Sequence, residues 1–239
     1  MEYRNTPPER FATMPPRAEP VAQTGFMQAV YSWMTVGLLL TAVTAFWVMN
    51  TESVLSALYS NQLLFYGLLG AELLMVIAFT GLVNRVSMTV AAAMFLGYSL
   101  LNGITMAAIL FLYTATSVAS TFFVTAGTFG AMSIYGYTTG RDLSRLGSLL
   151  FMALIGVILA SVVNFFLKST AIYWITTYVG ILVFVGLIAY DTQKLRAIHE
   201  SGHAHGEAGG KLALRGALTL YLDFINLFLL LLRLLGRRR

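Results

Sequence analysis

The sequence predicts an all-α polytopic membrane protein, and three observations support that fold class. Apolar residues make up 58% of the chain and charged residues only 10%, against about a quarter in an ordinary soluble domain. The apolar residues gather in runs of roughly 20, the length that a helix needs to cross a bilayer. These runs lack the short alternating pattern of a membrane β-barrel. A soluble globule and a disordered chain are therefore both excluded.

Two segments make up the predicted domain organisation. Residues 1–25 hold all five prolines, with arginines and glutamates interleaved, which is typical of a disordered tail. Residues 26–239 form the predicted seven-helix transmembrane domain. Its seven spans are expected, in order, at residues 28–49, 63–83, 88–113, 118–139, 146–167, 171–190 and 212–235.

The longest predicted loop is the polar, glycine-rich stretch 196–211. It holds His199, His203 and His205, which are all the histidines of the chain. Such a loop can bind a metal ion or respond to pH, but we favour a solvated linker.

Basic residues in the loops predict a multi-pass membrane protein with a cytoplasmic N-terminus. With seven spans, nine basic residues fall on the cytoplasmic side: Arg4, Arg10, Arg17, Arg85, Arg141, Arg145, Lys194, Arg196 and Lys211. Four fall on the far side: Lys168 and the terminal Arg237, Arg238 and Arg239. The terminal arginine triplet is the one conflict with this charge bias. It would be resolved if the last run were re-entrant, because the C-terminus would then lie in the cytoplasm. The same topology explains the net charge of +5, so no nucleic-acid partner is expected.

Ionisable residues inside apolar runs carry the functional information, because each costs several kcal/mol in lipid unless it is paired or hydrated. Asp223 lies in the last run with apolar residues on both sides, and Asp191 ends the sixth run. The two runs are antiparallel neighbours, so the carboxyl groups can face each other at similar depth. Two close carboxylates must share a proton or bind a cation. Oxygen ligands suit Ca²⁺, so Asp191 and Asp223 are the candidate cation site and pH sensor.

Three further charged residues are candidates for ion pairs. Glu72 in the second run and Arg233 in the last have opposite signs and lie in the same half of the membrane, where pairing would offset both costs. Arg85 ends the second run level with Asp191 and can act as a latch on that carboxylate. The alternatives are snorkelling for Arg233 and a simple loop anchor for Arg85.

Other polar features have simpler interpretations. Asn102, Asn164 and Asn226 are expected to hydrogen-bond between helices, and the spacing of Gly136 and Gly140 indicates a close helix contact.

Most enzyme classes are excluded, so we do not expect an enzyme. The chain has no cysteine, no histidine inside a span and no mid-span lysine. An intramembrane aspartyl protease is the class that the residues leave open, since paired aspartates in the sixth and seventh spans resemble the presenilin arrangement. Against it, the Gly-x-Gly and Pro-Ala-Leu motifs of that family are missing.

Two strings around these aspartates look like those of the Bax-inhibitor motif proteins, and the bacterial inner-membrane branch fits best. They are residues 186–194, GLIAYDTQK, and residues 216–228, GALTLYLDFINLF. Residues 125–133 and 136–139 add to the resemblance, which covers roughly residues 20–239.

The resemblance implies a bundle of seven helices with the C-terminal helix at its centre, and a pH-sensitive calcium leak without a cofactor. It implies that Asp191 and Asp223 form the family's aspartate pair, that Glu72 and Arg233 form an ion pair, and that Arg85 is the latch. Its partners would be the lipid bilayer, Ca²⁺ and protons. Some bacterial relatives instead bind the membrane AAA protease FtsH, so a modulator of that protease is the alternative function, with the tail 1–25 as the binding element.

Overall fold

The computed structural model describes residues 24–202 and 206–239, which form eight α-helices and no β-strand. The helices are α1 (Thr24–Met49), α2 (Glu52–Ser60), α3 (Gln62–Leu82), α4 (Met88–Leu110), α5 (Ala115–Thr138), α6 (Ser144–Leu167), α7 (Thr170–Glu200) and α8 (Gly206–Leu235). Seven of them, all except α2, are long and apolar enough to cross a membrane. The predicted fold class is confirmed, and each expected span corresponds to one helix. Most of the tail 1–25 lies outside the described residues.

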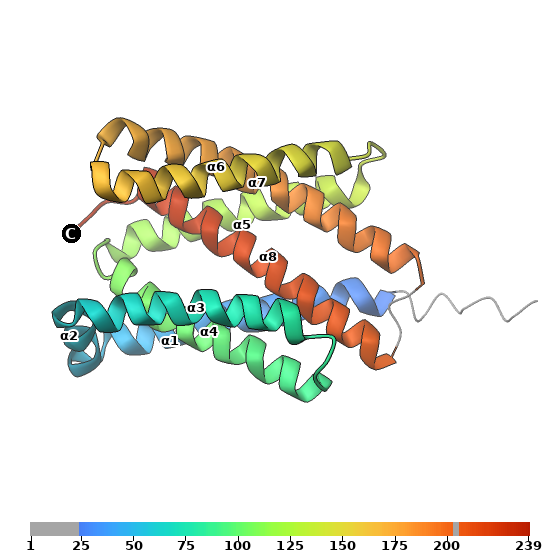
Figure 1. Cartoon of the computed structure of the whole chain (residues 1–239), viewed down its shortest axis with the longest axis horizontal. Helices are drawn as coiled ribbons and strands as arrows, with labels where there is room; N and C mark the ends of the chain where they lie inside the picture. Colours follow the sequence, from blue (N-terminus) through green and yellow to red (C-terminus); the bar gives the residue numbers. More distant parts are fainter. Residues whose placement is uncertain (1–23, 203–205) are drawn as a thin grey trace, which may run out of the picture.

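Helix α8 is the centre of the bundle, as expected. It packs against α1, α4, α5 and α7. In its most apolar stretch of 18 residues, 56% of the residues are buried, against 6% in the corresponding stretches of α3 and α6. Figure 1 shows α8 running obliquely between α1, α3 and α4 on one side and α5, α6 and α7 on the other. The largely exposed, apolar α3 and α6 are therefore expected to meet lipid over most of their surface.

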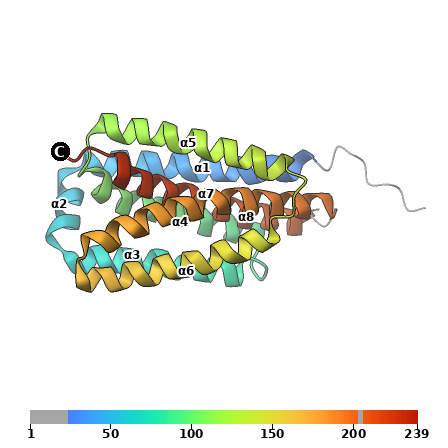
Figure 2. The same ribbon diagram turned by 90° about the horizontal axis from the view of Figure 1, so that it is seen from above.

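The chain ends at the opposite end of the bundle from the start of α1 (Figure 2). Helix α8 is continuous over 30 residues, so the last run is long enough to be a full span. Backbone hydrogen bonds then tie the terminal residues to the α4–α5 connection: the Thr114 N–H donates to the Arg237 carbonyl, and the Arg239 N–H donates to the Leu112 carbonyl, both at 3.0 Å. The terminal arginines are thus held in place at that end.

Two local features differ from the expectation. The prediction of a long loop at 196–211 is wrong, because α7 continues to Glu200 and α8 already begins at Gly206. The sequence analysis missed these helical turns because their residues are polar, whereas it recognised each span by its apolar residues. The short helix α2 was also not expected. Its 9 residues are too few to cross a membrane, and its Tyr59 hydroxyl donates to the Ala108 carbonyl of α4.

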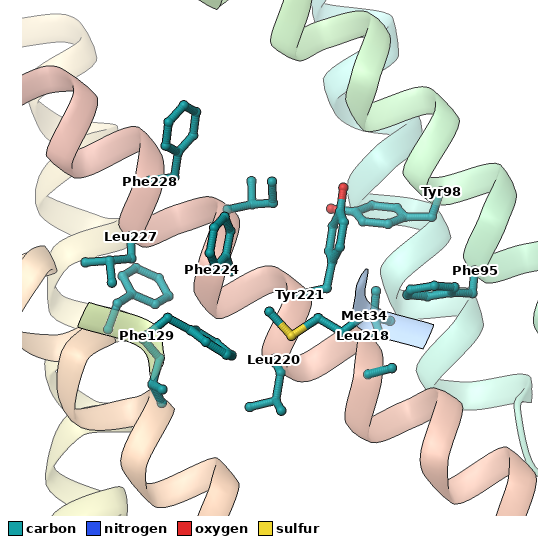
Figure 3. Close-up of a cluster of buried hydrophobic side chains, with 14 of the residues drawn as sticks. Met34, Phe95, Tyr98, Phe129, Leu218, Leu220, Tyr221, Phe224, Leu227 and Phe228 are labelled. Carbon is teal, nitrogen blue, oxygen red and sulfur yellow. The ribbon is translucent and has the colours of Figure 1, made fainter. Parts of the chain in front are cut away.

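Aromatic side chains fill the space around α8 (Figure 3). The Tyr221 ring packs edge-on against Phe95 and Tyr98 of α4, with centroids 6.0 and 5.8 Å apart. One turn further along α8, Phe224 packs against Phe129 of α5 at 5.6 Å. The central helix thus contacts both halves of the bundle through large rings. These contacts fix the rotation of α8 and hence the direction of its polar side chains.

A glycine allows α5 and α7 to approach each other closely. A Cβ atom added at Gly136 would overlap the backbone carbonyl of Ala189, whereas one added at Gly140 would meet nothing within 4 Å. Of the two glycines singled out in the sequence, Gly136 therefore makes the close contact and Gly140 does not. The contact lies two residues before Asp191, so it also sets the position of that carboxyl group.

Replacing Gly136 with alanine should destabilise the bundle by about 2 kcal/mol, because backbone atoms cannot move aside as a flexible side chain can. Gly130→Ala, in the same helix and with nothing within 4 Å, is the matched control and should be neutral or slightly stabilising. Thermal unfolding in detergent micelles measures both variants. Equal melting temperatures for the two would contradict the close α5–α7 contact.

Candidate functional site

The structure brings Asp191 and Asp223 together at the interface of α7 and α8. The Asp223 side chain is buried, with 5% of the residue exposed, and Asp191 is half-buried. The two carboxyl groups lie within hydrogen-bonding reach of each other. They do so because α7 and α8 are antiparallel neighbours that pack along their length.

The contact between these carboxyl groups limits their charge states. A carboxylate only accepts hydrogen bonds, so a bond between the two groups requires a proton on one of them. If that proton leaves, a cation must take its place between the oxygens, or the charges repel. Among the described residues, Asp223 Oδ2 has no hydrogen-bond donor. This oxygen is available to a proton or to a hard cation such as Ca²⁺.

The carboxyl pair lines a cavity of about 1190 Å³ between α6, α7 and α8. Along α7 the lining extends from Thr176 to Lys194, which spans about 27 Å at 1.5 Å per residue. A bilayer's hydrocarbon core is about 30 Å thick, so the cavity extends over most of that depth.

The two walls of the cavity differ in polarity. Helix α6 contributes large apolar side chains, among them Phe151 and Phe165. Helix α8 contributes Thr219, Asp223, Asn226 and Arg233. These polar side chains of α8 follow one line along the central helix. Thr176, Asp191 and Lys194 of α7 and Ser144, Ser148 and Ser161 of α6 add further polar groups to the lining. A hydrated ion could follow this line, with the carboxyl pair partway along it.

Glu72 lies in a different site from the carboxyl pair. Asn102 Nδ2 donates to Glu72 Oε2 at 3.4 Å, and the Thr105 hydroxyl donates to Oε1. The Tyr221 hydroxyl in turn donates to Asn102 Oδ1 at 3.0 Å and lies 2.7 Å from Thr41 Oγ1. This network, which we call the Glu72 network, links α3, α4, α8 and α1. Asn102 therefore has the interhelical role expected for it.

The other two membrane asparagines bond locally. Asn226 Nδ2 donates to the Leu222 carbonyl one turn earlier in α8, at 2.8 Å. Asn164 Oδ1 accepts the Ser169 N–H at 2.8 Å and closes the α6–α7 turn. The interhelical hydrogen bonds expected of Asn164 and Asn226 do not form among the described residues.

The expected ion pairs also do not form in the described part of the chain, where the ion pairs are Arg196–Glu200 and Lys211–Glu207. Arg233 instead donates to the Thr177 hydroxyl at 3.4 Å and lies 4.8 Å from the centre of the Tyr173 ring. Arg85 is exposed in the α3–α4 connection. The cation whose charge acts on Asp191 is Lys194, one turn further along α7.

Two polar residues for which the sequence analysis predicted no contact hold the end of α7 in place. Gln193 Nε2 donates to the Arg141 carbonyl at 2.8 Å. Arg196 donates to the Tyr137 carbonyl, and its guanidinium lies 5.5 Å from the centre of that ring. Together they tie α7 to the last turn of α5 and to the segment that follows it. Their signal was the polar run that follows Asp191, of which Arg196 was placed at the start of the predicted loop 196–211.

The histidines show no metal site in the described residues. His199 stacks on Phe26, with ring centroids 6.2 Å apart, while His203 and His205 lie outside the described residues. Within 24–202 and 206–239 no group of three or more His, Asp or Glu residues could hold a metal ion. A cation at the carboxyl pair would therefore have only two protein ligands of this kind, which suits passage better than retention.

Comparison with known proteins identifies relatives along nearly the whole chain. The family described as inhibitor of apoptosis-promoting Bax1 (Bax1-I) matches residues 23–239. The inner membrane protein YbhL of Escherichia coli K12 is 51% identical over 230 residues, which cover 94% of this chain and 98% of that protein. A protein of Rickettsia prowazekii is 42% identical over 217 residues, covering 90% of each chain. A protein of Borreliella burgdorferi is 40% identical over 223 residues, covering 93% of this chain and 96% of its own.

Replacing Tyr221 with phenylalanine should destabilise the protein by about 1 kcal/mol, because it removes the hydroxyl that joins Asn102 and Thr41 in the Glu72 network. Tyr98→Phe is the matched control. Tyr98 is buried against the same ring, and its hydroxyl has no hydrogen bond within the described residues. Unfolding in detergent should separate the two variants. A larger loss for Tyr98→Phe would show that the rings, and not the network, stabilise this region.

Proposed function

We propose a cation leak as the function of this chain, which belongs to the Bax1-I family of membrane proteins. Its seven spanning helices and its inner-membrane relative identify it as a multi-pass protein of the inner membrane. The observation that carries the proposal is the Asp191–Asp223 pair in a cavity that extends over most of the bilayer depth. Ca²⁺ is the proposed cation, because the pair offers hard oxygen ligands.

Protons and Ca²⁺ would compete for the same carboxyl oxygens. With both groups ionised, the pair would hold a divalent cation more strongly than after protonation, and the cation would bridge α7 to α8. Protonation would weaken that hold, and conduction needs binding that is weak enough for the ion to leave. The leak should therefore increase as the pH falls. The titratable or charged groups that line the cavity with the pair are Tyr190, Lys194 and Arg233.

The proposal differs from the sequence expectation in what closes the cytoplasmic end. Arg85 does not contact Asp191, so the latch is assigned instead to the contacts of Gln193 and Arg196 with the last turn of α5 and the segment that follows it. These contacts would hold α7 in place while the carboxyl pair changes its charge.

Asparagine variants test the carboxyl pair, since they keep the shape and remove the charge. Asp191→Asn should give a calcium flux into proteoliposomes that no longer depends on pH, and Asp223→Asn should reduce the flux or shift its pH dependence. A flux governed by one proton changes by up to about tenfold per pH unit, so measurements at two pH values are sufficient.

The matched control is Glu52→Gln, which removes an exposed carboxylate in α2, far from the cavity. It should leave both the flux and its pH response unchanged. A normal pH response in the double Asn variant, with an unchanged melting profile, would refute the proposed sensor. The histidine segment around residues 199–205 would then be the next candidate.

Orientation is a separate prediction, made from the basic residues at the two ends of the bundle. The chain should have its N-terminus in the cytoplasm and its C-terminus on the far side, because it crosses the membrane seven times. Reporters that fluoresce only in the cytoplasm, fused to each terminus in turn, give the measurement. Signal from the C-terminal fusion alone would reverse the orientation, and signal from both would contradict seven spans.

A further inference from the structure

A second cavity, of about 500 Å³, lies at the end of the bundle where the chain terminates. Three basic side chains from separate segments line it: Lys168 from the α6–α7 turn, Arg233 from α8 and Arg238 from the terminal residues. We call it the basic pocket. Figure 1 shows the C-terminus at the same end of the bundle as the α6–α7 turn. The aspartate pair is more than two turns of α8 away from it.

No carboxylate side chain of the described residues lines the basic pocket. The ion pairs of residues 24–202 and 206–239 lie at the opposite end of the bundle. Like charges that converge on one cavity repel one another unless an anion is bound between them. Ser169 and Thr170 also line the pocket, so the positive end of the α7 dipole adds to the three cations.

The surrounding residues place the pocket at the level of the lipid headgroups. Tyr173 and Trp174 line it, and Trp174 stacks on the half-exposed Tyr178. Tyrosine and tryptophan are enriched where a membrane meets water. A phosphate at this depth would belong to a phospholipid of the leaflet on that side.

The backbone is fixed at two of the three basic residues before any ligand binds. Lys168 has a positive φ of 51°, a conformation that a lysine rarely adopts, and its N–H donates to the Asn164 carbonyl at 2.8 Å. Arg238 forms an antiparallel bridge with Tyr113. The backbone of the pocket is thus formed in advance, so binding has to order only the side chains of these two residues.

We propose that the basic pocket binds the phosphate of an anionic phospholipid headgroup such as phosphatidylglycerol. Basic pockets between membrane helices are a known type of headgroup site. Arg233 lines both this pocket and the larger cavity. A bound phosphate would therefore add negative charge at one mouth of the larger cavity, whatever passes through it.

The test measures binding directly, by titrating the purified full chain in detergent with dioleoyl phosphatidylglycerol and reading the bound lipid by native mass spectrometry. The double variant Lys168→Asn with Arg238→Gln removes two cations. Asparagine tolerates the left-handed backbone at 168, and the bridge at 238 uses backbone atoms only. Phosphatidylglycerol binding should weaken about twenty-five-fold, or about fivefold for each cation, while the weak binding of dioleoyl phosphatidylcholine stays unchanged.

The matched control is Arg141→Gln with Arg145→Gln, which removes the same charge from exposed residues at the opposite end of the bundle. It should bind phosphatidylglycerol as the unmodified chain does. Equal losses in the two double variants, with melting temperatures unchanged, would overturn the proposal by showing that only net charge matters. Thermal stabilisation by inorganic phosphate without any preference for phosphatidylglycerol would overturn the lipid and assign the site to a soluble phosphate.

Discussion

The structure depends on the burial of α8, a helix that is both apolar and charged. Asp223 could not face lipid without a cost of several kcal/mol, and its burial requires neighbours on every side. Helices α1, α4, α5 and α7 supply them. The aromatic contacts of Tyr221 and Phe224 fix the rotation of α8, and Gly136 brings α5 close to α7 beside Asp191. The meeting of the two aspartates is therefore a consequence of how the central helix is enclosed.

Much of this could be predicted from the sequence because membrane insertion leaves a strong signal in composition. Runs of 20 apolar residues correspond directly to spans, and the antiparallel order of the last two brings Asp191 and Asp223 to one depth. The central place of α8 was predicted only through the family resemblance, although its concentration of polar groups is consistent with it. Beyond the apolar residues of a run, the composition no longer indicates whether the helix continues. The polar last turns of α7 and the short α2 were missed for this reason.

Side-chain partners could not be predicted in the same way, because depth in the membrane does not give the direction around a helix. Glu72 and Arg233 have opposite signs and belong to one half of the bilayer, yet α3 packs on α4 and not on α8. Glu72 thus bonds to Asn102 and Thr105 from α4, and Arg233 turns to α7. In the same way, Arg85 was predicted to lie level with Asp191, but it is exposed in the α3–α4 connection and does not contact that carboxyl group. Charge complementarity predicts which groups need partners, while packing decides which partners they obtain.

The order of charges along the larger cavity has a consequence for the proposed leak. A cation that moves along α8 meets Arg233 near one end, the carboxyl pair further in, and Lys194 at the other end. The pair attracts the cation, and the two basic groups repel it on either side. Entry is therefore opposed while the central site is favourable, which is typical of slow passage and not of an open pore. A phosphate in the basic pocket would offset Arg233 and lower only that barrier, so the lipid would act on entry from one side and leave the proton-controlled step unchanged.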